Sequence, residues 1–250
     1  MTATLPDVRF VMGAGLRLAY REWNEDARGL PLVTLHGITR SSASWDETAG
    51  HLPGRRVIAF DARGHGESDW DPEEGYTADM HFADVAEALD GLSIERCIIV
   101  GFSMGGATAM LTAACLPDRI AGLVVVDAYP DPEQTVGSAQ IARWVSGRTP
   151  LTAGFDPAIS RKFSEMIAAG LATRADLRGI WAAVPCPALV IRGAESDVLP
   201  FETAQRMLAA LPQARLATVA GVGHGIPYSK PKELAELLET FARETECGGA

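Results

Sequence analysis

Short, continuous apolar runs recur along the chain, and helix-like segments separate most of them. The runs lie at residues 31–35, 56–60, 97–100, 120–126 and 187–191, and a Gly, Asp or His follows each within two residues. Strands that are apolar on both faces are typical of a parallel sheet covered by helices on both sides. The pattern therefore predicts an α/β protein with a mostly parallel sheet.

This alternation of strands and helices is interrupted once. Residues 130–184 contain no strong strand signal and several helix-like stretches. A plain connection is seldom this long, and such an insertion commonly covers a binding site. We expect one core domain, formed by residues 1–129 and 185–250, with a helical cap at 130–184.

Ser103 lies at the centre of a Gly-x-Ser-x-Gly segment, residues 101–105, between an apolar run and a helix-like stretch. The flanking glycines lack Cβ atoms, so the chain can bend sharply there and present the serine hydroxyl to a ligand. A serine at this place could also simply cap the helix. The strand before it and the helix after it favour a nucleophile.

A serine nucleophile needs a base, and the base needs a carboxylate to orient it. His224 lies in a glycine-rich loop after the last predicted strand. Asp197 follows the run at 187–191, at the kind of strand end where sites in α/β sheets gather. We expect Asp197 to be the acid; Asp127 and Glu195 remain alternatives.

The negatively charged intermediate of acyl transfer also needs hydrogen-bond donors. The backbone N–H of Met104 directly follows the serine and begins a helix, where free N–H groups favour an anion. The backbone N–H of Ile38, in the loop after the run at 31–35, is expected to be the second donor.

The overall composition limits the partners that the protein can have. The 250-residue chain has a formal net charge of −10, which argues against nucleic acid or an anionic membrane. Its four cysteines show neither a metal-ligand spacing nor a disulfide framework, and no apolar stretch could span a bilayer. We expect a cytoplasmic protein that acts on a small molecule.

Taken together, the motifs resemble those of the α/β-hydrolase superfamily, in particular its small serine esterases, enol-lactone hydrolases and cofactor-free haloperoxidase-like members. The resemblance rests on the segments 36–37, 61–68, 101–106, 193–200 and 221–224. It implies an eight-stranded, mostly parallel sheet with a cap after the sixth strand, and no metal or organic cofactor. It also implies that His36 and His65 organise loops rather than react.

The resemblance implies hydrolysis of a carboxylic ester or lactone through an acyl-enzyme on Ser103. A serine in place of an aspartate argues against the haloalkane dehalogenase and epoxide hydrolase branches. The same residues could serve carbon–carbon bond hydrolysis, perhydrolysis or a biosynthetic tailoring step. A ligand receptor of the same fold is a non-enzymatic alternative. Nothing in the sequence specifies the acyl group or the oligomeric state.

Three tryptophans are candidates for contact with the substrate. Trp45 follows the loop of Ile38, and Trp144 and Trp181 lie in the predicted cap. Aromatic side chains at such positions can equally pack within the protein, and that alternative stays open here.

Overall fold

The computed structural model describes residues 5–130, 154–168 and 177–248, with the side chains of 163–168 excepted. Within these ranges, no helix combines the length and apolarity that crossing a bilayer requires.

Eight strands form one sheet. They are β1 (Arg9–Met12), β2 (Arg17–Trp23), β3 (Leu32–Leu35), β4 (Val57–Phe60), β5 (Cys97–Phe102), β6 (Ile120–Val126), β7 (Ala188–Gly193) and β8 (Ala214–Val219). The helices among the described residues are the 3-10 helix η1 (Ser42–Trp45), α1 (Asp46–Gly50), α2 (Ala78–Gly91), α3 (Met104–Cys115), α5 (Pro157–Ala168), α6 (Arg178–Ala182), α7 (Phe201–Ala210), α8 (Ile226–Ser229) and α9 (Pro231–Gly248).

The strand order is β1-β2-β4-β3-β5-β6-β7-β8, and from β4 to β8 all neighbouring strands are parallel. The pairs β1–β2 and β2–β4 are antiparallel, so β2 alone runs against the other seven strands. The predicted eight-stranded, mostly parallel sheet is therefore confirmed. After β3 the chain crosses to β4 on one side, and then to β5 on the other. Such a reversal opens a crevice at the carboxyl ends of the strands, where ligands bind in open α/β sheets.

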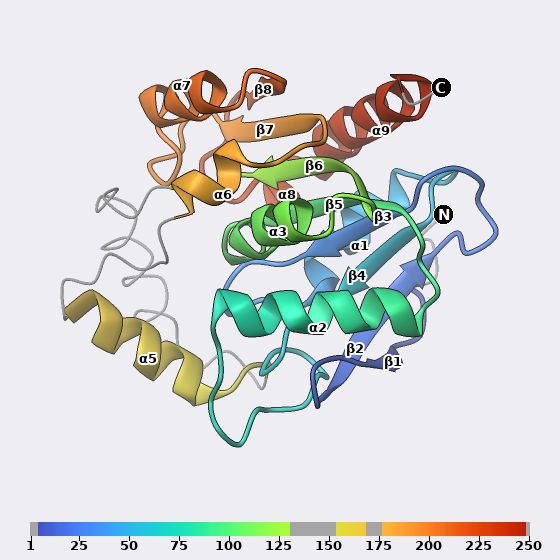
Figure 1. Cartoon of the computed structure of the whole chain (residues 1–250), viewed down its shortest axis with the longest axis vertical. Coiled ribbons are helices and arrows are strands. Elements are labelled where there is room, and N and C mark those ends of the chain that lie inside the picture. The colour runs from blue at the N-terminus through green and yellow to red at the C-terminus, as the bar shows by residue number, and fades with distance from the viewer. Residues whose placement is uncertain (1–4, 131–153, 169–176, 249–250) are drawn as a thin grey trace.

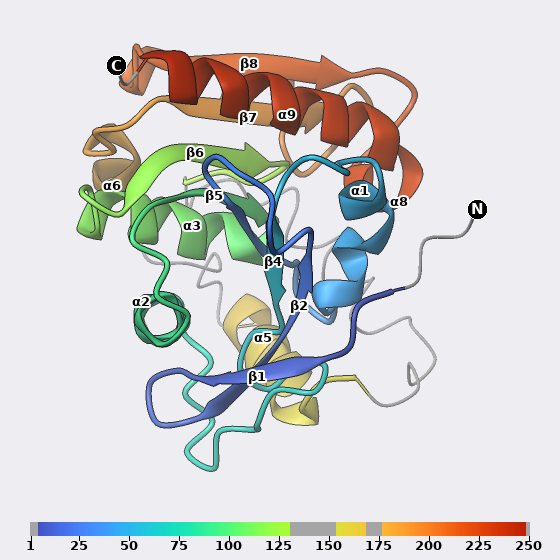
Figure 2. The same ribbon diagram turned by 90° about the vertical axis from the view of Figure 1, so that its right-hand side faces the viewer.

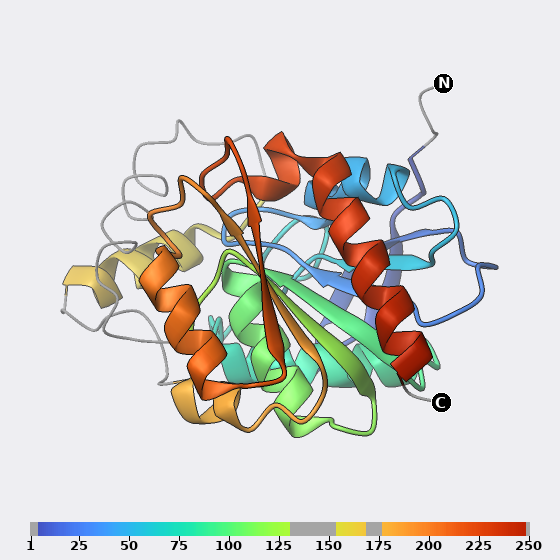
Figure 3. The same ribbon diagram turned by 90° about the horizontal axis from the view of Figure 1, so that it is seen from above.

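Alternate residues of each central strand face opposite sides of the sheet, and each side has its own hydrophobic core. Val125 of β6 belongs to the core formed with α2, α3, α6 and α7, whereas its neighbour Val126 belongs to the core formed with α1, α8 and α9. Figure 2 shows these two helical layers on either side of the sheet. In Figure 3, α9 lies along the face of the sheet that it covers together with α1 and α8. Burial on both faces explains why the strands appear in the sequence as continuous apolar runs.

Of the predicted cap, the structure describes α5 and α6, while residues 131–153 and 169–176 lie outside the described ranges. Figure 1 shows α5 beyond the end of the sheet, next to the loop that follows β4. An isolated bridge between His65 and Phe155 joins α5's leading segment to that loop. The division of the chain into a core and a cap stays a prediction.

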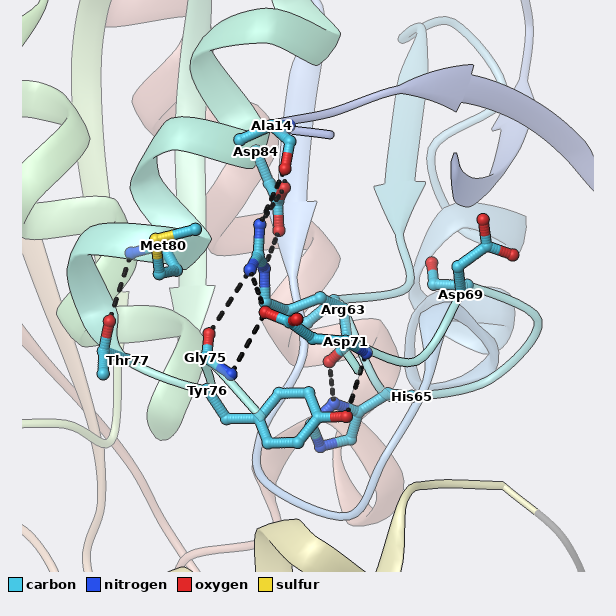
Figure 4. Close-up of polar contacts among 12 residues, drawn as sticks. Ala14, Arg63, His65, Asp69, Asp71, Gly75, Tyr76, Thr77, Met80 and Asp84 are labelled. Atoms are coloured by element: carbon cyan, nitrogen blue, oxygen red, sulfur yellow. Dashed lines mark hydrogen bonds and ion pairs between the residues drawn. The ribbon is translucent and has the colours of Figure 1, made fainter. Parts of the chain in front are cut away.

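Buried ion pairs hold the loop after β4, residues 61–76, against α2 (Figure 4). Arg63, whose side chain is 1% exposed, donates to both carboxylate oxygens of Asp84 at 2.6 and 2.8 Å. It also donates to Asp71 at 2.8 Å. Tyr76, in the same loop, donates to Asp156 just before α5 at 2.5 Å. The loop thus connects the sheet, α2 and the segment that leads into α5.

Candidate active site

Ser103 occupies a sharp turn between β5 and α3. Its backbone has φ 54° and ψ −115°, a conformation that side-chain-bearing residues seldom adopt. A Cβ on Gly101 would lie 2.2 Å from the carbonyl oxygen of Gly105, and a Cβ on Gly105 would lie 2.4 Å from that of Leu35. Both glycines are therefore sterically required, and the predicted strand–turn–helix elbow is present.

His224 lies in the loop between β8 and α8, and its side chain faces Ser103. The distance from His224 Nε2 to Ser103 Oγ is 3.1 Å. Both residues are buried, and the ring of Phe102 lies 4.8 Å from that of His224. The structure therefore brings together the predicted serine and the predicted base, which are 121 residues apart in the sequence.

Asp127, at the end of β6, is the carboxylate that contacts His224. Its Oδ2 lies 2.7 Å from His224 Nδ1, and its side chain is fully buried. Oδ1 accepts a hydrogen bond from the backbone N–H of Gly193 at 3.0 Å. Asp127 has φ 47°, and this left-handed turn follows directly on β6. Both carboxylate oxygens are thus fixed, and one of them faces the imidazole.

The assignment of Asp197 as the acid is wrong, because the structure gives its place to Asp127. No hydrogen bond joins the described side chains of Asp197 and His224, and Asp197 is partly exposed. Ser196 turns inward instead, and its hydroxyl donates to Asp127 Oδ2 at 2.5 Å. In this loop the side chain that points into the site is therefore that of Ser196, and not that of its neighbour Asp197. Glu195, the minor alternative, is exposed.

Ser196, which is buried and orients Asp127, was not among the site residues expected from the sequence. Its Oγ also accepts hydrogen bonds from the N–H groups of Val198 and Leu199, each at 3.2 Å. These two bonds leave the hydroxyl proton directed at Asp127. A serine between two acidic residues forms no recognisable pattern, so the sequence held no signal for this role.

Two buried histidines shape the loop after β3. His36 Nε2 accepts from the Ala62 N–H at 2.9 Å, and its Nδ1 donates to the Gly37 carbonyl at 2.7 Å. His65 Nε2 accepts from the Thr39 N–H at 3.3 Å, and its Nδ1 donates to the Arg63 carbonyl. Each ring has one donor and one acceptor nitrogen, as a neutral imidazole does.

Burial keeps both rings neutral. It lowers the pKa of His36 to about 4 and, with the nearby His36 ring as a further cause, the pKa of His65 to about 3. A protonated ring would lose its acceptor nitrogen. The two histidines therefore hold the loop in place as hydrogen-bond acceptors, in keeping with the structural role that the resemblance implied.

The loop after β3 lies beside the start of α3. The N–H of Gly105 donates to the carbonyl of His36 at 3.1 Å, which fixes the distance between the two segments. Within the described chain, the backbone N–H groups of Ile38 and Met104 donate to no acceptor. Both are therefore free to bind a ligand oxygen, as the predicted oxyanion donors must be.

The candidate substrate contacts divide between core positions and residues that the structure does not describe. Trp45 and Trp181 are each 1% exposed and belong to the two hydrophobic cores. Trp181 also donates from its indole N–H to the Met207 carbonyl at 2.8 Å. Both are therefore core residues and not the substrate contacts that were expected. The third candidate, Trp144, lies outside the described residues. In the part of the chain that is described, no group of His, Cys, Asp and Glu could hold a metal ion.

Comparison with known proteins agrees with this geometry. Residues 32–237, a span that includes the serine, the histidine and Asp127, match the model of the alpha/beta hydrolase family. The chain belongs to the α/β-hydrolase family. This membership makes the protein a hydrolase, and it favours an enzyme over the receptor alternative.

Several α/β hydrolases are similar to this chain over most or part of its length. A 3-hydroxybutyrate-oligomer hydrolase of Cupriavidus necator is 29% identical over 284 residues, covering 94% of this chain and 96% of that protein. An sn-1-specific diacylglycerol lipase of Mus musculus is 40% identical over 118 residues, covering 46% of this chain and 38% of the lipase. The structure of a thermophilic esterase from Thermogutta terrifontis superposes with a TM-score of 0.74 at 25% identity, covering 96% and 99% of the two chains.

Proposed function

We propose that this α/β hydrolase cleaves carboxylic esters or lactones through an acyl-enzyme on Ser103. The proposal rests above all on the continuous series of hydrogen bonds from Asp127 Oδ2 to His224 Nδ1, 2.7 Å, and from His224 Nε2 to Ser103 Oγ, 3.1 Å. In this arrangement Ser103 Oγ can give its proton to His224 Nε2, while His224 Nδ1 donates a hydrogen bond to the carboxylate of Asp127.

In the first half of the reaction, Ser103 Oγ attacks the carbonyl carbon while His224 Nε2 takes the hydroxyl proton. The carbonyl oxygen becomes an oxyanion, which the N–H groups of Ile38 and Met104 bind. Asp127 stabilises the imidazolium and keeps Nδ1 protonated. When the tetrahedral intermediate collapses, the carbon–oxygen bond to the leaving alkoxide breaks, and His224 gives it the proton.

In the second half, His224 accepts a proton from water, and the resulting hydroxide attacks the acyl carbon. Collapse of this second intermediate breaks the bond to Ser103 Oγ, which recovers a proton from His224. The products are a carboxylic acid and an alcohol, or a single hydroxy acid when the substrate is a lactone. No metal or organic cofactor has a part in these steps.

The similar proteins support an ester as the substrate. Their names describe a hydrolase of 3-hydroxybutyrate oligomers, a lipase and an esterase. The other expectations from the sequence stay predictions: the cytoplasmic location, the cap, the lack of a nucleic-acid partner and the lack of a cofactor.

Replacement of the nucleophile tests the proposal. Ser103→Ala removes the attacking oxygen, so turnover of p-nitrophenyl acetate is expected to fall by about 10⁴-fold or more. Ser229→Ala is a matched control, because Ser229 is exposed in α8 and its hydroxyl is not part of the hydrogen-bond series. Hydrolysis by Ser103→Ala at the control's rate would contradict the proposal.

A further inference from the structure

Arg40 lies two residues after Ile38, one of the proposed oxyanion donors. Its backbone N–H donates to the Gly37 carbonyl at 3.2 Å, so it belongs to the same turn as Ile38. Its guanidinium carbon lies 4.8 Å from the centre of the Tyr228 ring. Tyr228 follows His224 by four positions, and its hydroxyl donates to Ser44 Oγ at 2.9 Å. Arg40 thus connects the loop of the oxyanion donor with the loop of the base.

A series of aromatic contacts continues from Arg40 to the base. The ring of Tyr228 lies 6.0 Å from that of Phe102, which in turn lies 4.8 Å from that of His224. Tyr228 is 39% exposed, and Arg40 is partly exposed. The guanidinium is therefore accessible from solvent without any opening of the core.

Arg40 has no carboxylate partner within the described ranges, unlike most of the arginines that are buried or partly buried there. Arg21, Arg55 and Arg56 form ion pairs with Asp or Glu. Arg192, which is 6% exposed, instead donates to two backbone carbonyls, so its N–H groups are already used within the protein. Among the described residues no carboxylate lies within ion-pair distance of Arg40. In a protein of net charge −10, the turn that holds Ile38 thus carries a positive charge that no carboxylate of the described residues neutralises.

The contact with Tyr228 leaves the guanidinium able to bind an anion, because its N–H groups donate to no acceptor among the described residues. A guanidinium over an aromatic ring is held by its face, while its N–H groups point outward in its own plane. Those N–H groups match the two oxygens of a carboxylate in a bidentate pair. Because Ser44 fixes the Tyr228 hydroxyl, the platform under Arg40 is held in place before a ligand arrives.

We propose that Arg40 binds a free carboxylate of the substrate, so that the enzyme prefers esters that also carry a carboxylate. This inference rests on the proposed function of Ser103 as an ester-cleaving nucleophile. The carboxylate can belong either to the acyl part, as in a half-ester of a dicarboxylic acid, or to the alcohol part, as in an acylated hydroxy acid.

The test compares charged and neutral esters of similar length. Monomethyl glutarate and methyl pentanoate differ by a carboxylate on the acyl side, and 4-acetoxybutanoate and butyl acetate differ by one on the alcohol side. The measured quantity is the ratio of kcat/KM for the charged ester to that for its neutral partner. Arg40→Met is expected to lower this ratio about 10- to 100-fold for one pair, mainly through KM. The affected pair identifies the side that carries the carboxylate.

Two controls separate charge recognition from packing. Arg40→Lys keeps the charge and loses the bidentate geometry, so its ratio should lie between those of wild type and Arg40→Met. Arg96→Met removes an exposed arginine just before β5, at the opposite end of that strand from Ser103, and should leave the wild-type ratio. Added salt should also lower the wild-type ratio, because the site is partly exposed.

A ratio that stays within about twofold of wild type in Arg40→Met for both pairs would overturn the inference, since bidentate charged pairs are worth more than this. The neutral esters distinguish this failure from failure of the proposed function. If wild type hydrolyses the neutral esters and the ratio does not change, only the inference is wrong. If wild type hydrolyses none of the esters, the proposed function fails, and the inference fails with it.

Discussion

Asp127 and Asp197 follow adjacent parallel strands, β6 and β7, so both lie at the same edge of the sheet. The sequence could place both carboxylates near His224, but the direction of each side chain depends on single backbone angles. Asp127 itself has φ 47°, and its side chain reaches His224. In the loop after β7, the side chain of Ser196 rather than that of Asp197 points into the site. Neither detail follows from hydrophobic pattern or from spacing.

Substitution of Asp127 should lower activity strongly, whereas substitution of Asp197 should have little effect. Asp127→Asn keeps the size of the side chain but no longer holds His224 in the right tautomer, so kcat/KM should fall by about 10³- to 10⁴-fold. Asp197→Asn is the matched control and should remain within about threefold of wild type, because this partly exposed side chain does not contact His224. Both are measured by p-nitrophenyl acetate hydrolysis. A larger loss in Asp197→Asn would show that the acid lies after β7.

At the scale of elements, the sequence predicts the parallel strands well, because burial on both faces makes each of them a continuous apolar run. It does not predict how the helical stretches between β6 and β7 are oriented, since the periodicity of a short helix carries no such information. The loop at residues 61–76 is a third case. Its motif is evident in the sequence, yet the pairing of Arg63 with Asp84 on α2 depends on tertiary packing.

The Arg63 ion pairs should contribute strongly to stability. Arg63→Met leaves Asp84, whose side chain is 4% exposed, as a buried charge without its partner. The free energy of unfolding should therefore fall by about 3 kcal/mol. Arg17→Met breaks the exposed pair with Asp69, 53% and 40% exposed, and should cost less than about 1 kcal/mol. Urea unfolding measures both, and equal losses would contradict this account of the loop.

For the molecule as a whole, three buried histidines near one end of the sheet make stability dependent on pH. His36 and His81 line the same small pocket, and His65 packs against His36. Burial lowers the pKa of His81 to about 3, against an ordinary value of 6.5. The unfolded chain therefore binds protons that the folded chain does not, and stability must fall as the pH drops below about 6.5 towards the folded-state pKa values.

His81 is the suitable residue for a test, because its Nε2 has no hydrogen-bond partner among the described residues. His81→Leu removes both the unpaired nitrogen and the titrating group. At pH 7 its free energy of unfolding should equal or exceed that of wild type. Between pH 7 and about pH 5 the variant should lose about 2 kcal/mol less than wild type. Urea unfolding at several pH values measures this, and parallel pH profiles for the two proteins would contradict it.

The central claim is that Ser103 becomes covalently acylated. Reaction with a fluorophosphonate, followed by peptide mass spectrometry, tests it most directly, because the reagent labels a serine only when a base activates it. The account predicts one adduct per chain, located on Ser103 and lost in His224→Ala. A wild-type protein that hydrolyses esters while Ser103 stays unlabelled, or that carries the adduct on another residue, would contradict it.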